Sequence, residues 1–271
     1  MRLPPVPDSF YWTDAPWGAA LRCRPLDSLA PHLFTTRQLS LASAAGYGQL
    51  AAALGVEHVA TLTQVHGSAV SIVRHGTAIP QQGPEADALV SNAPLIAVAV
   101  RAADCVPLLM ADSMTGAVAA IHAGWRGTAA RVAVAALNAM EREYGTHPAN
   151  VVAAIGPRIG PCCYAVGSDL VDAFAAAGHE RYLIERWFST PASAEDFGGA
   201  SRGAPGAGKW PQLRLDVGGA NRDQLVLAGV PERQIYDSRL CTAMHLQVLT
   251  SYRAEKEHAG RIAGAIVAAR R

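Results

Sequence analysis

The sequence lacks an excess of charge of either sign. Its 271 residues include 23 Lys and Arg against 22 Asp and Glu, which gives a formal net charge of +1. A protein that binds nucleic acid or an anionic membrane usually carries concentrated positive charge. The composition therefore predicts neither a nucleic acid nor a membrane as partner.

Long apolar runs are also absent. The most hydrophobic stretch, residues 95–100, is followed closely by Arg101 and Asp104. It is much shorter than the roughly 20 residues that a membrane-spanning helix needs. No apolar segment follows Arg2, so the sequence predicts no secretory signal, and we expect a cytoplasmic protein.

Cysteine is scarce, and its five positions are scattered: Cys23, Cys105, Cys162, Cys163 and Cys241. An odd count at irregular spacing argues against a disulfide framework in a chain of this size. The neighbours Cys162 and Cys163 could close a vicinal disulfide, but that ring is strained. Small buried thiols are the preferred interpretation.

Half of the residues are hydrophobic, which suits a globular protein with a sizeable core. Short apolar runs separated by turn residues predict strands, several of them buried on both faces. The predicted strands are 33–36, 59–64, 69–73, 86–90, 95–100, 106–111, 117–121, 151–155, 234–237 and 261–267.

Helical spacing predicts four helices between these strands. A short one covers 47–54, and a longer one begins after Gly127 with Thr128 as its N-cap and ends at Gly145. Ser168 can cap a third that runs to 177, and 215–227 is the fourth. Residues 197–210, rich in Gly, Pro, Ser and Ala, predict a mobile surface loop. With no repeat and no linker, we predict one α/β domain over 1–271, with a mixed sheet.

Three short segments carry the candidate chemistry: Gln-Val-His-Gly at 64–67, Ala-Asp-Cys at 103–105 and His-Ala-Gly-Trp-Arg-Gly at 122–127. Each lies at or beside a predicted strand end, where side chains far apart in sequence can converge. His66, Cys105 and His122 would suit zinc, with a fourth position left for water or substrate. Spacing alone gives a weak signal, because a core thiol and two turn histidines explain the same pattern.

Arg126 lies just before the predicted start of the long helix. A guanidinium beside free backbone N–H groups can hold an oxyanion such as phosphate. Arg126 could equally pair with an acid such as Asp104 or Glu85, and both interpretations stay open.

An ordered set of motifs resembles the laccase-domain family, also called the multicopper polyphenol oxidase family. The three segments above match its hallmarks, and the resemblance covers roughly residues 33 to 268. Further matches are Ala86-Asp87-Ala88, Ile155-Gly156-Pro157, Ile159-Gly160-Pro161-Cys162-Cys163-Tyr164, Cys241-Thr242, Ser251-Tyr252-Arg253 and Gly260-Arg261.

The resemblance implies a single mixed α/β (α+β) domain of stacked layers, similar to a toxin deamidase domain with a Cys–His site. It implies zinc bound by His66, Cys105 and His122, with copper as the alternative metal. Members of the family resemble purine nucleoside phosphorylases that also deaminate adenosine and cleave methylthioadenosine. We therefore expect a nucleoside and phosphate as small-molecule partners, and a monomer or homodimer.

For phosphorolysis, Arg126 is the candidate phosphate ligand, together with Arg37 or Arg253, and Gln64 is a candidate substrate contact. Asp104 could orient a histidine or shuttle a proton behind the metal ligands. Since neighbouring residues on a strand point to opposite faces, a structural role for Asp104 is the better prediction.

The sequence departs from the family pattern in two places. The stretch 38–50 is shortened, and in 246–254 the expected aromatic residues are missing and Ala254 replaces an arginine. If these stretches line the nucleoside pocket, substrate preference and rate differ from those of relatives.

Three other readings remain open. Cys105 could be the nucleophile of a metal-free thiol hydrolase in peptidoglycan precursor editing, with His122 or His66 as base. A copper polyphenol oxidase would need clustered histidines, and the nine here are scattered. A non-enzymatic zinc protein would close the site with Cys241 or His245 as fourth ligand.

Overall fold

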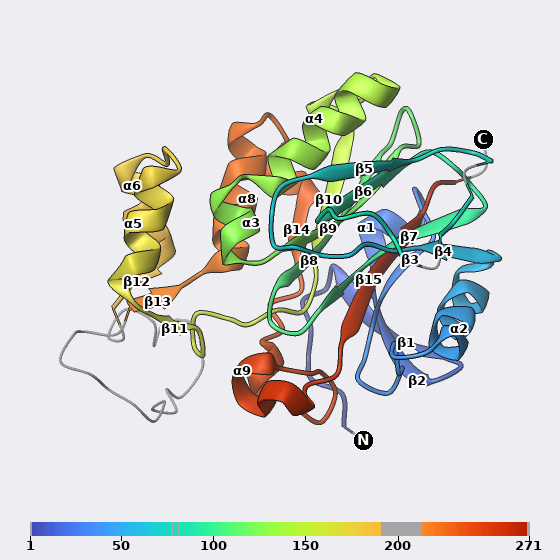
Figure 1. Cartoon of the computed structure of the whole chain (residues 1–271), viewed down its shortest axis with the longest axis horizontal. Helices are drawn as coiled ribbons and strands as arrows, with labels where there is room; N and C mark the ends of the chain where they lie inside the picture. Colours follow the sequence, from blue (N-terminus) through green and yellow to red (C-terminus); the bar gives the residue numbers. More distant parts are fainter. Residues whose placement is uncertain (1, 77, 81, 191–212, 270–271) are drawn as a thin grey trace.

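Two large mixed sheets form the centre of the computed structural model, which describes residues 2–76, 78–80, 82–190 and 213–269 (Figure 1). The first sheet has the order β1 (Phe10–Ala15), β2 (Gly18–Cys23), β3 (His32–Thr35), β15 (Ile262–Val267), β7 (Ile96–Ala102), β4 (His58–Ala60). The second has the order β14 (Ile235–Asp237), β10 (Val151–Ile155), β8 (Val106–Asp112), β9 (Val118–Ala123), β6 (Ala88–Ser91), β5 (Val70–Val73).

Most neighbouring strands in these sheets are antiparallel, and three pairs are parallel: β4 with β7, β5 with β6, and β10 with β14. A smaller sheet joins β11 (Ala165–Val166), β13 (Leu213–Leu215) and β12 (Phe188–Ser189). The predicted mixed α/β class is therefore confirmed.

Several helices pack against the two large sheets, and others lie beside the small sheet. The described helices are α1 (Arg24–Asp27), α2 (Ala44–Leu54), α3 (Trp125–Ala129), α4 (Val132–Tyr144), α5 (Ser168–Ala176), α6 (Arg181–Trp187), α8 (Val217–Leu227) and α9 (Tyr252–Glu255). Figure 1 shows α2 at the opposite side of the molecule from α5 and α6. Within the described residues, no helix is long and apolar enough to cross a membrane.

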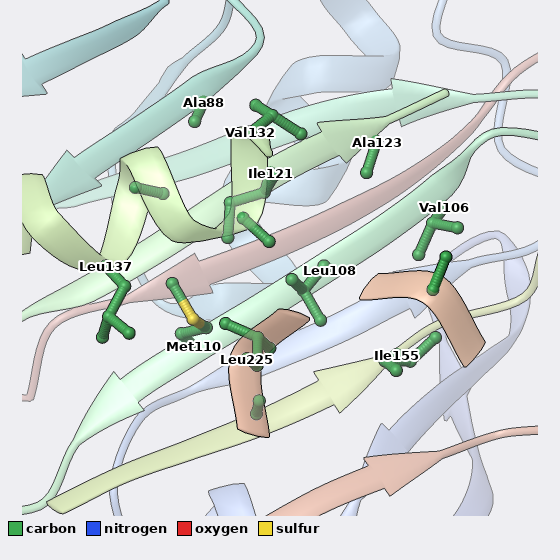
Figure 2. Packing of buried hydrophobic residues seen from close by; sticks show 14 of the residues in the cluster. Ala88, Val106, Leu108, Met110, Ile121, Ala123, Val132, Leu137, Ile155 and Leu225 are labelled. Atoms are coloured by element: carbon green, nitrogen blue, oxygen red, sulfur yellow. The ribbon is translucent and has the colours of Figure 1, made fainter. Parts of the chain in front are cut away.

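The apolar run of β8 explains why the layers stack. Val106, Leu108 and Met110 are fully buried in a cluster shared with α4 and α8 (Figure 2). The intervening Leu109 and Ala111 join a second cluster together with β7 and β15 of the first sheet. Since successive side chains of a strand point to opposite faces, a strand between two such layers must be apolar at every position.

The long helix begins differently from its prediction. The chain forms the short α3, adopts a left-handed conformation at Arg131 (φ 58°), and restarts as α4. Thr128 is therefore inside α3 and does not cap α4. Its hydroxyl accepts a hydrogen bond from Asn221 Nδ2 at 2.9 Å, and its carbonyl accepts one from Gln224 Nε2 at 2.9 Å. These contacts to α8 are tertiary, and local spacing does not report them.

Most predicted strands match observed ones, but 59–64 is too long. Strand β4 ends at Ala60, and Thr63 forms only an isolated bridge with Glu85. The sequence also did not predict β1 and β2, whose hairpin turns at Gly18 with φ 122°. The expected loop at 197–210 lies outside the described residues.

A buried histidine in β3 leads to a test of this packing. Burial lowers the pKa of His32 to about 4, helped by the nearby Arg22, although Ala30 O accepts from its ring nitrogen at 2.9 Å. The unfolded chain takes up a proton near pH 6.5, whereas the folded protein does so only near pH 4. Stability contributed by neutral His32 is therefore present above pH 6.5 and is lost as the pH falls to about 4.

Urea unfolding between pH 7 and pH 4.5 should show this loss, which amounts to about 3 kcal/mol at its limit. A His32→Gln variant, uncharged at every pH, should be less stable at pH 7 but should lose less on acidification. Equal pH dependence of the two proteins would contradict this account of His32.

Candidate metal centre

Three segments distant in sequence bring His66, Cys105 and His122 together. Cys105 directly precedes β8 and His122 is the next-to-last residue of the neighbouring antiparallel β9, so the strand pairing places them side by side. His66 lies on the connection between β4 and β5. The candidate ligand atoms of all three lie within 4.8 Å of one another. The two imidazole rings meet edge to face, with their centroids 4.8 Å apart.

The backbone turn at His66 has a left-handed conformation, with φ 62°. The Asp87 carboxylate accepts hydrogen bonds from the backbone N–H groups of His66 at 3.0 Å and Gly67 at 2.6 Å. Gln64 fixes the other side, since its amide donates to Arg101 O at 2.7 Å and accepts from Arg101 N at 2.8 Å. The turn is therefore held at both ends by side chains.

Asp87 also orients His122. Its carboxylate accepts the Nδ1–H of His122 at 2.8 Å, and neither side chain has appreciable solvent exposure. This bond leaves Nε2 of His122 free to face Cys105 and His66, which is the arrangement by which a carboxylate fixes a metal-binding histidine.

Sequence reasoning did not propose Asp87 as a site residue. The sequence does place this acidic residue inside the apolar stretch 86–90. Burying a carboxylate is costly unless hydrogen-bond donors surround it, and this could have marked Asp87 as a site residue.

Electrostatics couple the cluster. Burial opposes ionisation of the Cys105 thiol, but hydrogen bonds to His122 and His66 outweigh it and bring the pKa of Cys105 to about 7. Burial likewise opposes charge on His122, yet its contacts with Asp87 and Cys105 raise its pKa to about 9. Burial would raise the pKa of Asp87, but the hydrogen bonds from His122 and Gly67 lower it. The cluster favours a thiolate, the form in which cysteine binds a metal.

The donor set fits a divalent transition metal. Zinc accepts imidazole nitrogen and thiolate sulfur, and three protein ligands leave a coordination position for another molecule. Among the described residues, this cluster contains no fourth donor, and Cys241 belongs to a different group of cysteines. The non-enzymatic reading with a closed four-ligand site is therefore not supported.

A large cavity of about 1640 Å³ opens beside the cluster. His66, Cys105 and His122 all line it, and so does Trp125. Its wall also contains several arginines and tyrosines: Arg37, Arg101, Arg253, Arg261, Tyr47, Tyr164 and Tyr252. This lining suits an anionic or aromatic small molecule.

The predicted phosphate ligands occupy different positions. Arg253 lines the cavity, its guanidinium lies over the Tyr164 ring at 5.3 Å, and one nitrogen donates to Ala165 O at 3.0 Å. Arg37 also lines the cavity, but its charge is paired with Glu255 at 2.9 Å. Arg126 lies inside α3 with its guanidinium 4.3 Å from the Trp125 ring centroid. Of the three, Arg253 has the geometry that best suits an anion.

Gln64 and Asp104 both line the cavity, and both are hydrogen-bonded within the protein. Both ends of the Gln64 amide bind the backbone of Arg101 and fix the His66 turn, and its role as a substrate contact stays a prediction. Asp104 accepts from Thr242 Oγ1 and from the Arg253 backbone N, both at 2.6 Å. Asp87, and not Asp104, contacts His122, and the two contacts of Asp104 favour its structural interpretation, which stays a prediction.

Layered mixed sheets with a His–Cys–His cluster in a large cavity define the class of a candidate metalloenzyme. The chain belongs to the multi-copper polyphenol oxidoreductase laccase family, whose model matches residues 40–269. The resemblance drawn from the motifs is thus confirmed.

Relatives in this family carry names of nucleoside enzymes. A purine nucleoside phosphorylase of Bacteroides thetaiotaomicron is 35% identical over 181 residues, covering 67% of this chain and 60% of the relative. One of the same name from Deinococcus radiodurans is 32% identical over 255 residues, covering 86% and 87%. Adenosine deaminase RL5, from an unknown prokaryotic organism, is 36% identical over 156 residues, covering 58% and 52%. The chain thus spans less than two thirds of two of these relatives.

The fold has a close counterpart among solved structures. The crystal structure of the hypothetical protein YfiH from Bacillus licheniformis aligns with a TM-score of 0.80 and 25% identity, over 94% of this chain and 98% of that one.

Replacing Asp87 tests the orientation of His122. In Asp87→Asn, the side-chain N–H group would face N–H donors that now bind the carboxylate oxygens. His122 would lose its orienting acceptor, so metal affinity should fall by about 10- to 100-fold. Competition against a chromophoric chelator measures this. Asp112→Asn is the matched control, since Asp112 is an equally buried acid at the far end of β8. Equal metal affinity of both variants and the wild type would contradict the role of Asp87.

Gly124 tests the packing of the cluster. A Cβ at Gly124 would lie 2.8 Å from Cys105 Sγ and 3.1 Å from His66 Cδ2, so Gly124→Ala must displace a ligand. We expect metal affinity to fall at least about tenfold, as for other changes beside metal ligands. Gly48→Ala meets nothing within 4 Å and should retain metal. Unchanged affinity in Gly124→Ala would show that the ligands are not packed against this glycine.

Proposed function

We propose that this protein is a zinc-dependent purine nucleoside phosphorylase that also deaminates adenosine and cleaves methylthioadenosine. The observation that carries the proposal is the convergence of His66, Cys105 and His122 on one side of a large cavity whose wall bears arginines. The names of the relatives support a nucleoside as the substrate class.

His66, Cys105 and His122 would hold the zinc, and Asp87 would keep His122 in the required tautomer. When bound, the ion supplies a Lewis acid that polarises an oxygen of the bound reactants. In phosphorolysis a phosphate oxygen forms a bond to the ribose anomeric carbon while the bond to the purine nitrogen breaks. The protein must hold phosphate in line and stabilise charge on the departing base.

Arg253 is the proposed phosphate ligand. Arg37, which lines the same cavity, is a weaker contributor because Glu255 neutralises its charge. Trp125 and Tyr164 offer aromatic faces in the cavity wall on which a purine can stack. Arg126 acts indirectly, by packing on the Trp125 ring.

The two stretches that depart from the family pattern border the same cavity. Leu39, Leu41 and Tyr47 come from the shortened stretch 38–50, and Tyr252 and Arg253 come from 246–254. We therefore propose that these stretches set which nucleoside is preferred, whereas the metal cluster sets the reaction.

A thiol hydrolase is the second candidate function, with a Cys–His architecture like that of toxin deamidases. The observation in its favour is the order Cys105, His122, Asp87, in which a low-pKa thiol meets an imidazole oriented by a carboxylate. This is the arrangement of nucleophile, base and orienting acid. In that case Cys105 Sγ would form a thioester with an acyl carbon of a peptidoglycan precursor while the bond to the amine or alcohol breaks and that group leaves with a proton from His122, and water would then hydrolyse the thioester.

Copper oxidase chemistry of the multicopper kind receives little support. All nine histidines lie in described residues, and only His66 and His122 belong to a three-ligand cluster. Several clustered imidazoles would be needed for such centres.

The proposed function predicts that purified zinc-loaded protein converts inosine to hypoxanthine only when phosphate is present. Cys105→Ala should reduce kcat/KM by at least about 1000-fold, since it removes a metal ligand, while Cys23→Ala, a change in a core thiol, should not. Arg253→Ala should raise the KM for phosphate about 10- to 100-fold, with Arg181→Ala on the exposed face of α6 as its control. Liquid chromatography of the bases and ribose phosphate measures each.

Full turnover by Cys105→Ala would overturn both candidate functions. Turnover that survives chelation but stops on alkylation of Cys105 by iodoacetamide would favour the thiol hydrolase.

A further inference from the structure

A second cluster of potential ligands lies outside the site described above. The sulfur atoms of Cys162, Cys163 and Cys241 lie within 4.8 Å of one another. All three are free thiols, and the Cys162 and Cys163 sulfurs are 3.7 Å apart, too far for the vicinal disulfide considered from the sequence. Their role as inert buried thiols does not explain why three converge on one point.

The backbone around these thiols is fixed by the pairing of two loops. Arg158 and Cys241 form a parallel bridge, in which Arg158 N donates to Leu240 O at 3.1 Å and Thr242 N donates to Arg158 O at 2.9 Å. The turn after Pro161 is closed by Cys163 N and Tyr164 N, which both donate to Gly160 O at 3.0 Å. The sulfurs are thus carried by structure that already exists before any ligand binds.

Gly160 makes room for this arrangement. A Cβ there would lie 3.3 Å from Cys162 Sγ and 3.6 Å from Cys241 Sγ. Its backbone N–H donates to Cys241 Sγ at 3.2 Å. Cys241 is buried, whereas Cys162 and Cys163 are half-buried.

The spacing suits a shared metal ion. Two sulfurs at about 2.3 Å from one ion, with a tetrahedral to trigonal angle between them, lie about 3.8–4.0 Å apart. The Cys162–Cys163 separation of 3.7 Å is close to this value. Small rotations of the side chains would bring the third sulfur into the same sphere.

Sulfur-only donors discriminate between metals. Zinc in a structural site takes four protein ligands and iron–sulfur clusters take four cysteines, whereas this cluster offers three in the described part of the chain. Soft thiolates favour Cu(I), whose filled d shell accepts a trigonal set of three sulfurs. We propose that Cys162, Cys163 and Cys241 form a second metal site that binds Cu(I), separate from the His–Cys–His centre.

The test uses zinc-loaded full-length protein, titrated anaerobically with Cu(I) buffered by a chromophoric Cu(I) chelator. We expect one equivalent of Cu(I) to bind without release of zinc, and X-ray absorption to show three sulfur ligands. Cys163→Ser and Cys241→Ser should each weaken binding at least about 100-fold, since each removes a ligand. Thermal unfolding by circular dichroism checks that both variants are folded.

Cys105→Ala and Cys23→Ser are the matched controls and should retain the Cu(I) equivalent. Loss of Cu(I) binding in Cys105→Ala with retention in folded Cys163→Ser would overturn the proposal, as would displacement of zinc or nitrogen ligands in the absorption spectrum. Retention of Zn(II) by the three cysteines in competition with Cu(I) would overturn it as well. None of these outcomes depends on nucleoside turnover.

Discussion

The buried carboxylate of Asp87 is the interaction on which the centre depends. It accepts hydrogen bonds from the backbone N–H groups of Val65, His66 and Gly67 and from His122 Nδ1. A buried anion is costly unless donors surround it, and these donors come from two separate segments of the chain. The same contact therefore closes the turn that carries one ligand and orients the ring of another.

Two strained backbone turns lie beside the cluster. His66 and Asp104 both have positive φ values, 62° and 88°, and are two of the five residues other than glycine that do so in the described part of the chain. A residue with a Cβ costs on the order of 1 kcal/mol in this conformation. Asp87 holds the first turn, and the Asp104 carboxylate holds the second through Thr242 and the Arg253 backbone. The strained backbone persists here because at least two hydrogen bonds to a carboxylate fix each turn.

The sequence predicts the elements that local patterns determine, and it misses those that depend on contacts between residues far apart in the chain. The apolar runs of β8 and β9 predict buried strands because every side chain on them meets a packed layer, which is a local pattern. The break between α3 and α4 was missed because Asn221 and Gln224 of α8, far along the chain, bind Thr128. The β1–β2 hairpin was missed because its alternation is weak.

Prediction of the candidate site is limited in the same way. The motifs identified His66, Cys105 and His122, since residue type alone restricts which chemistry they can perform. They identified neither Asp87 as the acid that orients His122 nor the two hydrogen bonds between the Gln64 amide and the Arg101 backbone. Both features depend on which groups lie within hydrogen-bond distance. The convergence of Cys162, Cys163 and Cys241 likewise rests on a bridge between two loops about 80 residues apart, for which sequence offers no periodic signal.

Different parts of the cavity wall are built from different kinds of structural element. The ligand-bearing side is made by the paired ends of β8 and β9 and by a turn held to them, so a change there disturbs the central sheet. Other lining residues come from helices and connections outside the two large sheets, including Tyr47 of α2 and Tyr252 and Arg253 of α9. Loops tolerate substitution and shortening where core strands do not. The stretches 38–50 and 246–254, which the motif comparison marks as departing from the family pattern, supply lining residues from such connections, whereas the ligand cluster lies on the strands and on a turn held to them.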